Sequence, residues 1–304
     1  MPLSTPESIK AYREAGRIAA EVRARARKLV TEGRSILEIC DKVEQWTVEL
    51  GGSPAFPCNV GVNESAAHYT SGPGDQSTVP RRSVVKIDIG VHVDGYIADT
   101  ATTVSLSPEL ARLERGAEAG LRAATETVKA GIRASEVGAA IEKVIKEHGL
   151  RPIWNLTGHQ VSRYSLHAGE VIPNVRSLSN RHRLGLGDVY AIEPFTTPPE
   201  APGEVINGQP GHIYLFLRKR PVKNSLGPAM LDYIRTSYKG LPFTDRWLLR
   251  HFREEDREKA FQELVGTKCL HNYSVLVEKS RSPVGQAEHT VLVTENGCEV
   301  FTDA

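Results

Sequence analysis

Cysteine is scarce in the sequence, and the four that occur stand far apart. Cys40, Cys58, Cys269 and Cys298 form no C-x-x-C pair in 304 residues. This spacing excludes a zinc knuckle and a disulfide framework, because both need closely grouped cysteines. We expect buried, unreactive thiols in a reducing compartment.

Net charge and long apolar runs are also lacking. The formal net charge is +1, so no strong field directs the chain toward nucleic acid or an acidic membrane. No apolar run approaches the length of a membrane span. Residues 1–7 contain neither the basic start nor the apolar stretch of a signal peptide. These absences predict a cytoplasmic protein that binds no membrane and no specific nucleic acid.

An internal repeat organises what is present. A shift of 98 residues places Gly33 on Gly131, and it also aligns the pairs Glu38/Glu136, Val43/Ile141, Gly51/Gly149 and Pro54/Pro152. Farther on, residues 84–88 resemble residues 189–193, and residues 98–100 resemble residues 287–290. Each half reads helix, helix, strand, strand. The pattern predicts an α/β (α+β) protein whose two halves are related by a pseudo-twofold axis.

Capping signals locate the helices. Thr5-Pro6-Glu7 predicts a helix that runs to about residue 30, and Ser35 with Glu38 predicts a second that stops at Gly51. A third helix is expected to open at Ser107, and a fourth is expected over about 135–148.

The second half is interrupted by an insertion. Its two strand-borne acids, Glu193 and Glu288, are separated by 94 residues. Residues 212–217 read as a strand, whereas 229–234 and 247–252 read as helices. We expect a catalytic domain of residues 1–223 and 273–304, with a helical subdomain formed by residues 224–272.

The corresponding acids of the first half lie on a hairpin. Asp94-Gly95 is a strong signal for a two-residue turn. With these residues in the turn, Asp88 pairs with Ala101 and Asp99 pairs with Gly90. Because strand side chains alternate, Asp88 and Asp99 share one face as diagonal neighbours, roughly 7–8 Å apart at Cα. Two carboxylates at that separation can meet at one pair of metal ions.

The four acids have two readings. A single aspartate in a strand is usually solvated, and that reading would make each acid a surface residue. However, Asp88 and Glu193 interrupt hydrophobic strands, and such acids are poor strand formers that are almost never buried without a partner. Close carboxylates also repel unless a cation intervenes. We therefore favour a divalent-metal site that includes Asp88, Asp99, Glu193 and Glu288.

Three of the ten histidines stand in chemically suggestive settings. His159 ends an expected strand directly after Gly158, His167 follows eight residues later, and His68 lies in a long loop over 54–80. For most other histidines, a hydrogen-bonded structural role is the better reading. His159 is the expected metal ligand among them.

These segments together resemble the type II methionine aminopeptidases of the archaeal kind, over essentially the whole chain. The long insertion between the last two acidic strands marks type II. The motifs are Ala55-Phe56-Pro57, Ala66-Ala67-His68-Tyr69-Thr70, Lys86-Ile87-Asp88-Ile89-Gly90, Asp99, Asn155-Leu156-Thr157-Gly158-His159, His167-Ala168-Gly169, Ala191-Ile192-Glu193-Pro194 and Glu288-His289-Thr290. The resemblance implies the pita-bread fold, in which two related halves with an antiparallel sheet covered by helices close on a two-metal site.

The resemblance also implies a ligand set. Two divalent ions per chain, of Co, Mn, Fe or Zn, would be held by Asp88, Asp99, His159, Glu193 and Glu288. Asp99 and Glu288 would bridge both ions. Glu193 would also move a proton in catalysis.

The substrate-binding residues follow in the same way. His68 and His167 match the family's two non-ligand active-site histidines. Phe56, Leu166, His212 and Tyr273 fall where the family lines the methionine pocket. Two departures bear on the pocket rim or on metal retention: Cys58 stands where threonine is commoner, and Ala287 replaces a larger residue. Neither removes a ligand.

The implied activity is removal of the N-terminal methionine from peptides and nascent proteins with a small second residue. A monomer is expected, and ribosome contact is left open. Two other readings remain. A pita-bread peptidase for Xaa-Pro bonds usually carries a further N-terminal domain, which residues 1–304 do not contain. A non-catalytic relative would bind ribosomes or nucleic acid, and the basic run 218–223 suits that role, but all five ligand types are retained.

Overall fold

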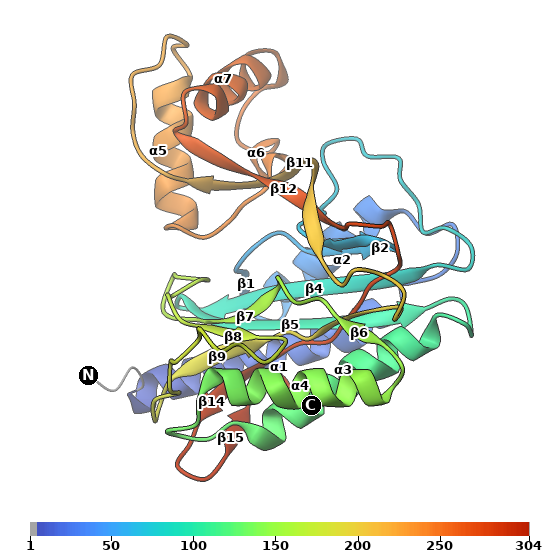
Figure 1. The fold of residues 1–304 in the computed structure, drawn as a ribbon. Coiled ribbons are helices and arrows are strands. Elements are labelled where there is room, and N and C mark those ends of the chain that lie inside the picture. The colour runs from blue at the N-terminus through green and yellow to red at the C-terminus, as the bar shows by residue number, and fades with distance from the viewer. Residues whose placement is uncertain (1–4, 304) are drawn as a thin grey trace.

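A computed structural model of the chain describes residues 5–303, without the side chains of residues 254 and 255 (Figure 1). The helices within those residues are α1 (Pro6–Arg27), α2 (Ile36–Glu49), α3 (Ala111–Thr127), α4 (Ala134–Glu147), α5 (Gly227–Tyr238), α6 (Asp245–Leu248) and α7 (Glu254–Gly266). Across 5–303, none of these helices combines the length and the apolar content needed to cross a membrane.

The strands form four antiparallel sheets. The first has the order β1 (Ser53–Pro54), β4 (Val84–Val93), β2 (Asn59–Val62), and β5 (Tyr96–Ser105) also pairs with β4. The second has the order β15 (Cys298–Val300), β14 (His289–Val293), β9 (Val189–Ile192), β7 (Thr157–Gln160), β8 (Val171–Pro173). The short sheets are β13 (Gly285–Gln286), β10 (Phe195–Thr197), β6 (Arg151–Pro152) and β11 (Val205–Phe216), β12 (Leu270–Glu278), β3 (Ser65–Ala67).

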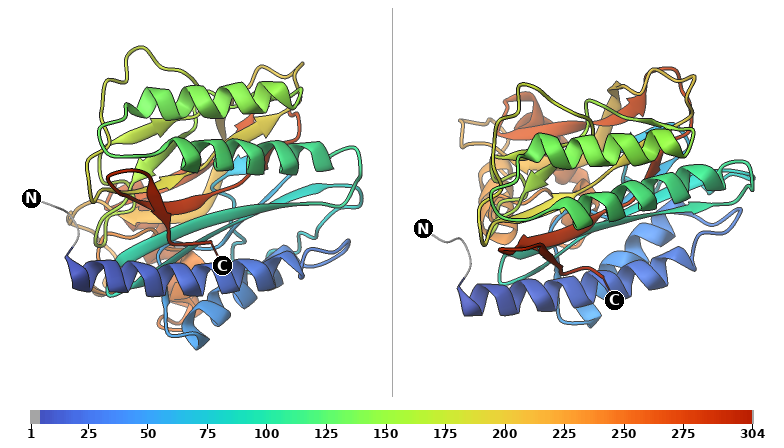
Figure 2. Two further views of the ribbon diagram at one scale, coloured as in Figure 1. Left: turned by 90° about the horizontal axis from the view of Figure 1, so that it is seen from below. Right: turned by 60° about the horizontal axis from the view of Figure 1, so that its bottom comes forward.

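The two larger sheets meet where β5 approaches β14. The Glu288 amide donates to the Ala101 carbonyl oxygen at 3.2 Å, and the Asp99 amide donates to Thr290 Oγ1 at 2.7 Å. Helices α1, α3 and α4 cover one side of these sheets, whereas α5, α6 and α7 stand on the other (Figures 1 and 2). The acids on β4 and β5 therefore lie between the sheets and the inserted helices.

The predicted repeat is confirmed in the backbone. Gly33 and Gly131 have φ angles of 79° and 83°, and Gly51 and Gly149 have φ angles of 92° and 68°. In each half the residue before the second helix makes an isolated β-bridge, at Ser35 in the first and Arg133 in the second. Equivalent glycines thus end or precede equivalent helices in both halves.

Several expected helix ends shift. The first helix ends at Arg27 rather than near residue 30, and α3 begins at Ala111 rather than at Ser107. Ser105 Oγ donates to the Ser107 carbonyl oxygen at 2.6 Å, so a local turn uses the groups that would have opened the helix. The helix expected over 247–252 is the short α6, which ends at Leu248.

The inserted helices have an apolar core of their own. Met230 and Ile234 of α5 pack with Phe243, and Phe261 and Leu264 of α7 join the same cluster. Tyr214 of β11 also belongs to this cluster, so the insertion rests on the sheet that crosses above the acids.

The acidic hairpin has the predicted register. Asp88 lies opposite Ala101, and Gly90 lies opposite Asp99. Asp94 and Gly95 both have positive φ, at 52° and 88°, as a two-residue type I′ turn requires. The two aspartates therefore share one face of the hairpin.

Replacing Gly95 by alanine is expected to lower the free energy of unfolding by about 2 kcal/mol, because the new methyl carries two costs. The positive φ disfavours any side chain, and an added Cβ would lie 2.4 Å from the Tyr164 ring. Urea denaturation measures the loss. Gly131→Ala is the matched control, because its φ is +83° with nothing within 4 Å of the added Cβ. Equal losses of stability at the two positions would show that the contact with the Tyr164 ring contributes nothing.

Candidate active site

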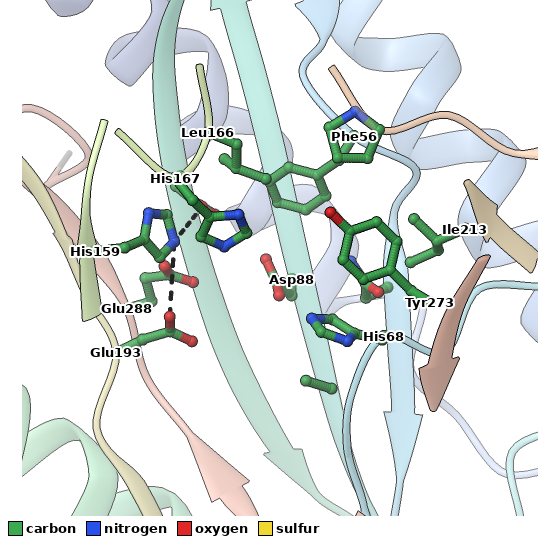
Figure 3. Close-up of a pocket in the computed structure, with 14 residues that line it drawn as sticks. Phe56, His68, Asp88, His159, Leu166, His167, Glu193, Ile213, Tyr273 and Glu288 are labelled. Atoms are coloured by element: carbon green, nitrogen blue, oxygen red, sulfur yellow. Dashed lines mark ion pairs between the residues drawn. The ribbon is translucent and has the colours of Figure 1, made fainter. Parts of the chain in front are cut away.

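All the predicted acids and the three selected histidines line one cavity of about 60 Å³ (Figure 3). The lining consists of Phe56, Asn59, Ala67, His68, Asp88, Asp99, His159, Leu166, His167, Glu193, Ile213, Pro242, Tyr273 and Glu288. Phe56, Leu166 and Tyr273, which were predicted for the pocket, are among them. Residues as far apart in sequence as 56 and 288 thus meet at one place.

The acidic end of the cavity is built from strands of both halves. Asp88 and Asp99 come from β4 and β5, and Glu193 directly follows β9. Single ligand atoms of Asp99, His159 and Glu288 all lie within 4.8 Å of one another. His159 Nε2 is also 3.7 Å from Glu193 Oε1. Figure 3 shows Asp88, His159, Glu193 and Glu288 directed at a common space.

Hydrogen bonds behind the acids hold their backbone in place. Thr290 Oγ1 accepts from the Asp99 amide and donates to the Asp99 carbonyl oxygen at 2.8 Å. Thr100 Oγ1 donates to the Glu288 carbonyl oxygen at 2.8 Å, and Asn174 Nδ2 donates to the Glu193 carbonyl oxygen at 3.0 Å. These buried threonine and asparagine side chains therefore fix the backbone positions from which the acidic side chains extend.

Burial makes the acids hard to ionise. Desolvation raises the pKa of Asp88 to about 7. Burial, and then the neighbouring negative charges, hold the pKa values of Asp99, Glu193 and Glu288 well above the usual range. Burial lowers the pKa of His159 to about 3, so its imidazole is neutral at pH 7. The acids thus face a neutral imidazole rather than a cationic one.

No permanently cationic side chain compensates the acids within the described lining, which contains neither lysine nor arginine. Lys86 is fully buried two residues from Asp88, but its Nζ donates to the carbonyl oxygens of Asn63 and Val284, each at 2.9 Å. Asp88 Oδ1 and Asp99 Oδ1 are buried without a hydrogen-bond partner. Oxygen donors with one imidazole suit Mn, Fe, Co or Zn, so the residues present fit divalent ions.

The opposite end of the cavity is aromatic and apolar. His68 packs edge-on against Tyr273 with ring centroids 5.3 Å apart, and burial lowers the pKa of His68 to about 4. The His167 ring lies 4.5 Å from the His159 ring, centroid to centroid. Phe56 covers Gly90, where an added Cβ would lie 2.2 Å from its ring. Gly90 therefore makes room for Phe56 rather than for the carboxylates.

His212 was predicted for the methionine pocket, but its side chain does not line the cavity. Its Nδ1 lies 2.9 Å from Asp245 Oδ2, and its ring packs on Gly72, where an added Cβ would lie 2.4 Å away. The next residue of β11, Ile213, faces the cavity instead, since successive strand side chains point to opposite sides. The sequence prediction was displaced by one position.

Four lining residues were not predicted: Asn59, Ala67, Ile213 and Pro242. Asn59 lies opposite Asp88 on the neighbouring strand, so the alternation of the first loop's short strands would have indicated it. The two departures, Cys58 and Ala287, are both buried in apolar clusters and do not line the cavity. The free thiols at 40, 58 and 269 are buried as expected.

Comparison with known proteins identifies the family. The model of metallopeptidase family M24 matches residues 10–295. The chain belongs to metallopeptidase family M24. The methionine aminopeptidase of Methanocaldococcus jannaschii is 44% identical over 289 residues, which cover 95% of this chain and 96% of that protein. This M24 chain is therefore a metal-dependent aminopeptidase, a hydrolase.

Solved structures agree on the fold of this M24 chain. Methionine aminopeptidase from Thermotoga maritima superimposes with a TM-score of 0.71 at 22% identity and covers 99% of both chains. A thermophilic Arx1 gives 0.82 at 18% identity, with 98% of this chain and 91% of that chain covered. Prolidase from Pyrococcus furiosus gives 0.64 at 19%, with all of this chain but only 66% of that chain covered. The fold is the pita-bread fold, with antiparallel sheets and covering helices.

Proposed function

We propose that this chain removes the N-terminal methionine from nascent proteins and peptides with a small second residue. The observation that carries the proposal is the convergence of four carboxylates and a neutral imidazole in a cavity whose described lining offers no lysine or arginine. The identity to a protein named methionine aminopeptidase supports the choice of substrate. Such a role suits a cytoplasmic monomer that meets chains as they emerge from the ribosome.

In this proposal two divalent ions are held by Asp88, Asp99, His159, Glu193 and Glu288. Asp99 and Glu288 would hold the ions at the most buried part of the site, since they are 3% and 1% exposed. Glu193 is suited to the rim of the site, since its side chain keeps 16% exposure. When bound, the ions supply Lewis-acid charge that lowers the pKa of water and polarises a carbonyl group.

The side chains around the ions carry the remaining chemistry. Glu193, at the solvent side of the acids, accepts a proton from the attacking water and returns it to the leaving amine. His68 is neutral above about pH 4, so it offers an uncharged N–H to the substrate amide. His167 is exposed at the mouth of the cavity and can donate to the carbonyl oxygen of the scissile bond.

Selection of methionine is assigned to the aromatic and apolar end. Phe56, Leu166, Ile213, Pro242 and Tyr273 leave a narrow space for one unbranched side chain. The small volume of the cavity, about 60 Å³, supports a requirement for a small second residue. We further propose that residues 224–272 act as a helical subdomain that supplies Pro242 to this pocket.

The substrate assay tests the proposal against its rivals. With a divalent ion added, the protein is expected to release methionine from Met-Ala-Ser at least about tenfold faster than the first residue from Met-Pro or Ala-Pro peptides. Faster cleavage of Ala-Pro would favour an Xaa-Pro peptidase. No cleavage of any of them, with no divalent ion retained, would favour a binding protein.

A further inference from the structure

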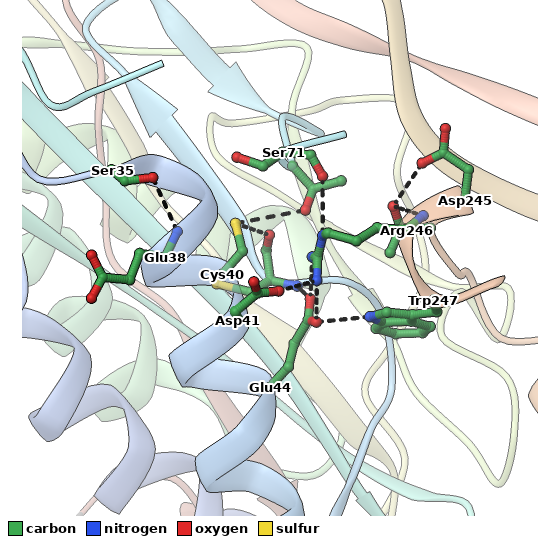
Figure 4. Close-up of polar contacts among 12 residues, drawn as sticks. Ser35, Glu38, Cys40, Asp41, Glu44, Ser71, Asp245, Arg246 and Trp247 are labelled. Atoms are coloured by element: carbon green, nitrogen blue, oxygen red, sulfur yellow. Dashed lines mark hydrogen bonds and ion pairs between the residues drawn. The ribbon is translucent and has the colours of Figure 1, made fainter. Parts of the chain in front are cut away.

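A buried ion pair joins the inserted helices to the first half of the chain (Figure 4). Arg246 of α6 has a side chain that is 9% exposed, and Glu44 of α2 has one that is 11% exposed. The guanidinium meets the carboxylate with two prongs, Nη1 to Oε2 and Nη2 to Oε1, both at 2.8 Å. Two-pronged contacts of this kind fix orientation as well as distance.

Every acceptor position of Glu44 is in use. Oε2 also accepts from Trp247 Nε1 at 2.7 Å, and Oε1 also accepts from the Cys58 amide at 3.3 Å. Arg246 in turn donates from Nη1 to Asp41 Oδ1 at 2.7 Å and from Nε to the Ser71 carbonyl oxygen at 3.3 Å. One carboxylate therefore binds α2, α6 and the loop after β1 together.

Each residue of this ion pair is connected to one wall of the cavity, Glu44 to the first and Arg246 to the second. The first wall is Phe56 and Asn59, which flank the Cys58 amide held by Glu44. The second wall is Ile213 and Pro242. Two backbone hydrogen bonds hold its two segments together, from Tyr214 to Phe243 at 2.7 Å and from Phe243 to Tyr214 at 2.8 Å, and Arg246 follows Phe243 by three residues along the chain.

We infer that the Arg246–Glu44 pair is a positioning device that sets the spacing of the first and second walls and thereby the selection of the N-terminal side chain. The inference rests on the proposed function, because it concerns the same pocket. Neither residue lines the cavity, so both act only through the walls. A buried ion pair is a poor source of stability compared with apolar packing, which makes fixed geometry the better explanation for its place here.

The test compares four proteins. Arg246→Met/Glu44→Leu replaces the pair by apolar side chains, a change that folds commonly tolerate. Arg246→Lys keeps the charge but loses the two-pronged contact. Arg13→Met is the control, since it breaks the exposed two-pronged pair with Glu299, with contacts at 2.6 and 2.9 Å, far from the walls.

For each protein, kcat and KM are measured with Met-Ala-Ser and Leu-Ala-Ser, and hydrogen exchange is measured at the Cys58 amide. In the double variant we expect KM for Met-Ala-Ser to rise at least about tenfold with kcat within about threefold, and preference for methionine over leucine to fall about tenfold. Arg246→Lys should lie between the double variant and the wild type. The Cys58 amide hydrogen should exchange faster in the double variant than in the wild type. In Arg13→Met it should exchange at the wild-type rate.

The outcomes separate this inference from the proposed function. A folded double variant with wild-type KM, preference and amide exchange would overturn the inference, as would a fall in kcat at constant KM. If the double variant does not fold, Arg246→Lys decides by the same measures. If the wild type itself releases no methionine, the proposed function fails, and exchange at Cys58 still decides whether the pair holds the first wall.

Discussion

Glu288→Gln is expected to lower kcat/KM for Met-Ala-Ser at least about 1000-fold, because it removes the charge of a carboxylate that would hold the proposed ions. Glutamine keeps the shape of the glutamate side chain. The hydrogen bond from the backbone N–H of Glu288 to the Ala101 carbonyl oxygen is unchanged. His159→Ala should cause a loss of similar size, since it removes the one nitrogen ligand. Both variants should also retain less divalent metal, as measured by elemental analysis of the purified proteins.

Glu278→Gln is the matched control for Glu288→Gln. Glu278 is also fully buried, but its Oε2 accepts from the Ser280 and Ser282 amides at 2.7 and 3.0 Å, and it does not line the cavity. It should lose stability and keep both metal and turnover per folded molecule. Turnover like that of the wild type by pure Glu288→Gln or His159→Ala would end the ligand assignment.

Adding excess Mn²⁺ to the metal-free protein is expected to stabilise it, and more strongly as the pH rises. Burial raises the pKa of Asp88 from about 3.8 to about 7, so the metal-free fold holds a proton there that unfolding releases. The contribution of Asp88 to the free energy of unfolding of the metal-free protein therefore falls as the pH rises from about 3.8 to about 7. Bound ions need the ionised form, so between pH 5.5 and 8 Asp88 alone should increase the gain from Mn²⁺ by about 2 kcal/mol, and the other acidic ligands, whose pKa values burial also raises, should add to it.

Urea denaturation with and without Mn²⁺ at each pH measures this gain. Taking the difference at one pH cancels groups that do not bind the ion, such as Lys86, whose pKa burial lowers to about 7. Asp88→Asn should make the gain rise less steeply with pH than in the wild type. A gain that is constant from pH 5.5 to 8 in the wild type would contradict the assignment of Asp88 as a ligand.

The acidic hairpin was predictable from sequence because its turn is chemically explicit. Asp94-Gly95 fixes the register, and register alone fixes which side chains share a face. The repeat was visible for a similar reason, since Gly33 and Gly131 occupy backbone conformations that favour glycine. Local rules sufficed wherever one or two residues determined the backbone.

Other features depend on contacts that no local rule specifies. His212 and Ile213 alternate on one strand, so choosing the wrong one follows from not knowing which face of β11 meets the cavity. Helix α7 was not predicted, because its apolar residues Ala260, Phe261 and Leu264 are buried by contacts with other inserted elements and with Tyr214 of β11, which no local pattern specifies. Likewise, nothing near Arg246 in the sequence indicates Glu44, which lies in another helix about 200 residues earlier.

The same contrast explains the site. The acids were conspicuous because they interrupt hydrophobic strands, whereas Asn59, Ile213 and Pro242 look like ordinary strand and loop residues. Their role arises only when both halves and the insertion close on one another. The sequence therefore indicated the chemistry of the site but not the shape of its pocket.

One measurement tests the central claim most directly. Metal-free protein is titrated with Mn²⁺ while bound ions per chain and methionine release from Met-Ala-Ser are recorded together. We expect negligible release before ions are added and recovery that follows occupancy up to two ions per chain. Full turnover by protein that retains less than about 0.1 ion per chain would contradict the claim that the five side chains act by holding divalent metal.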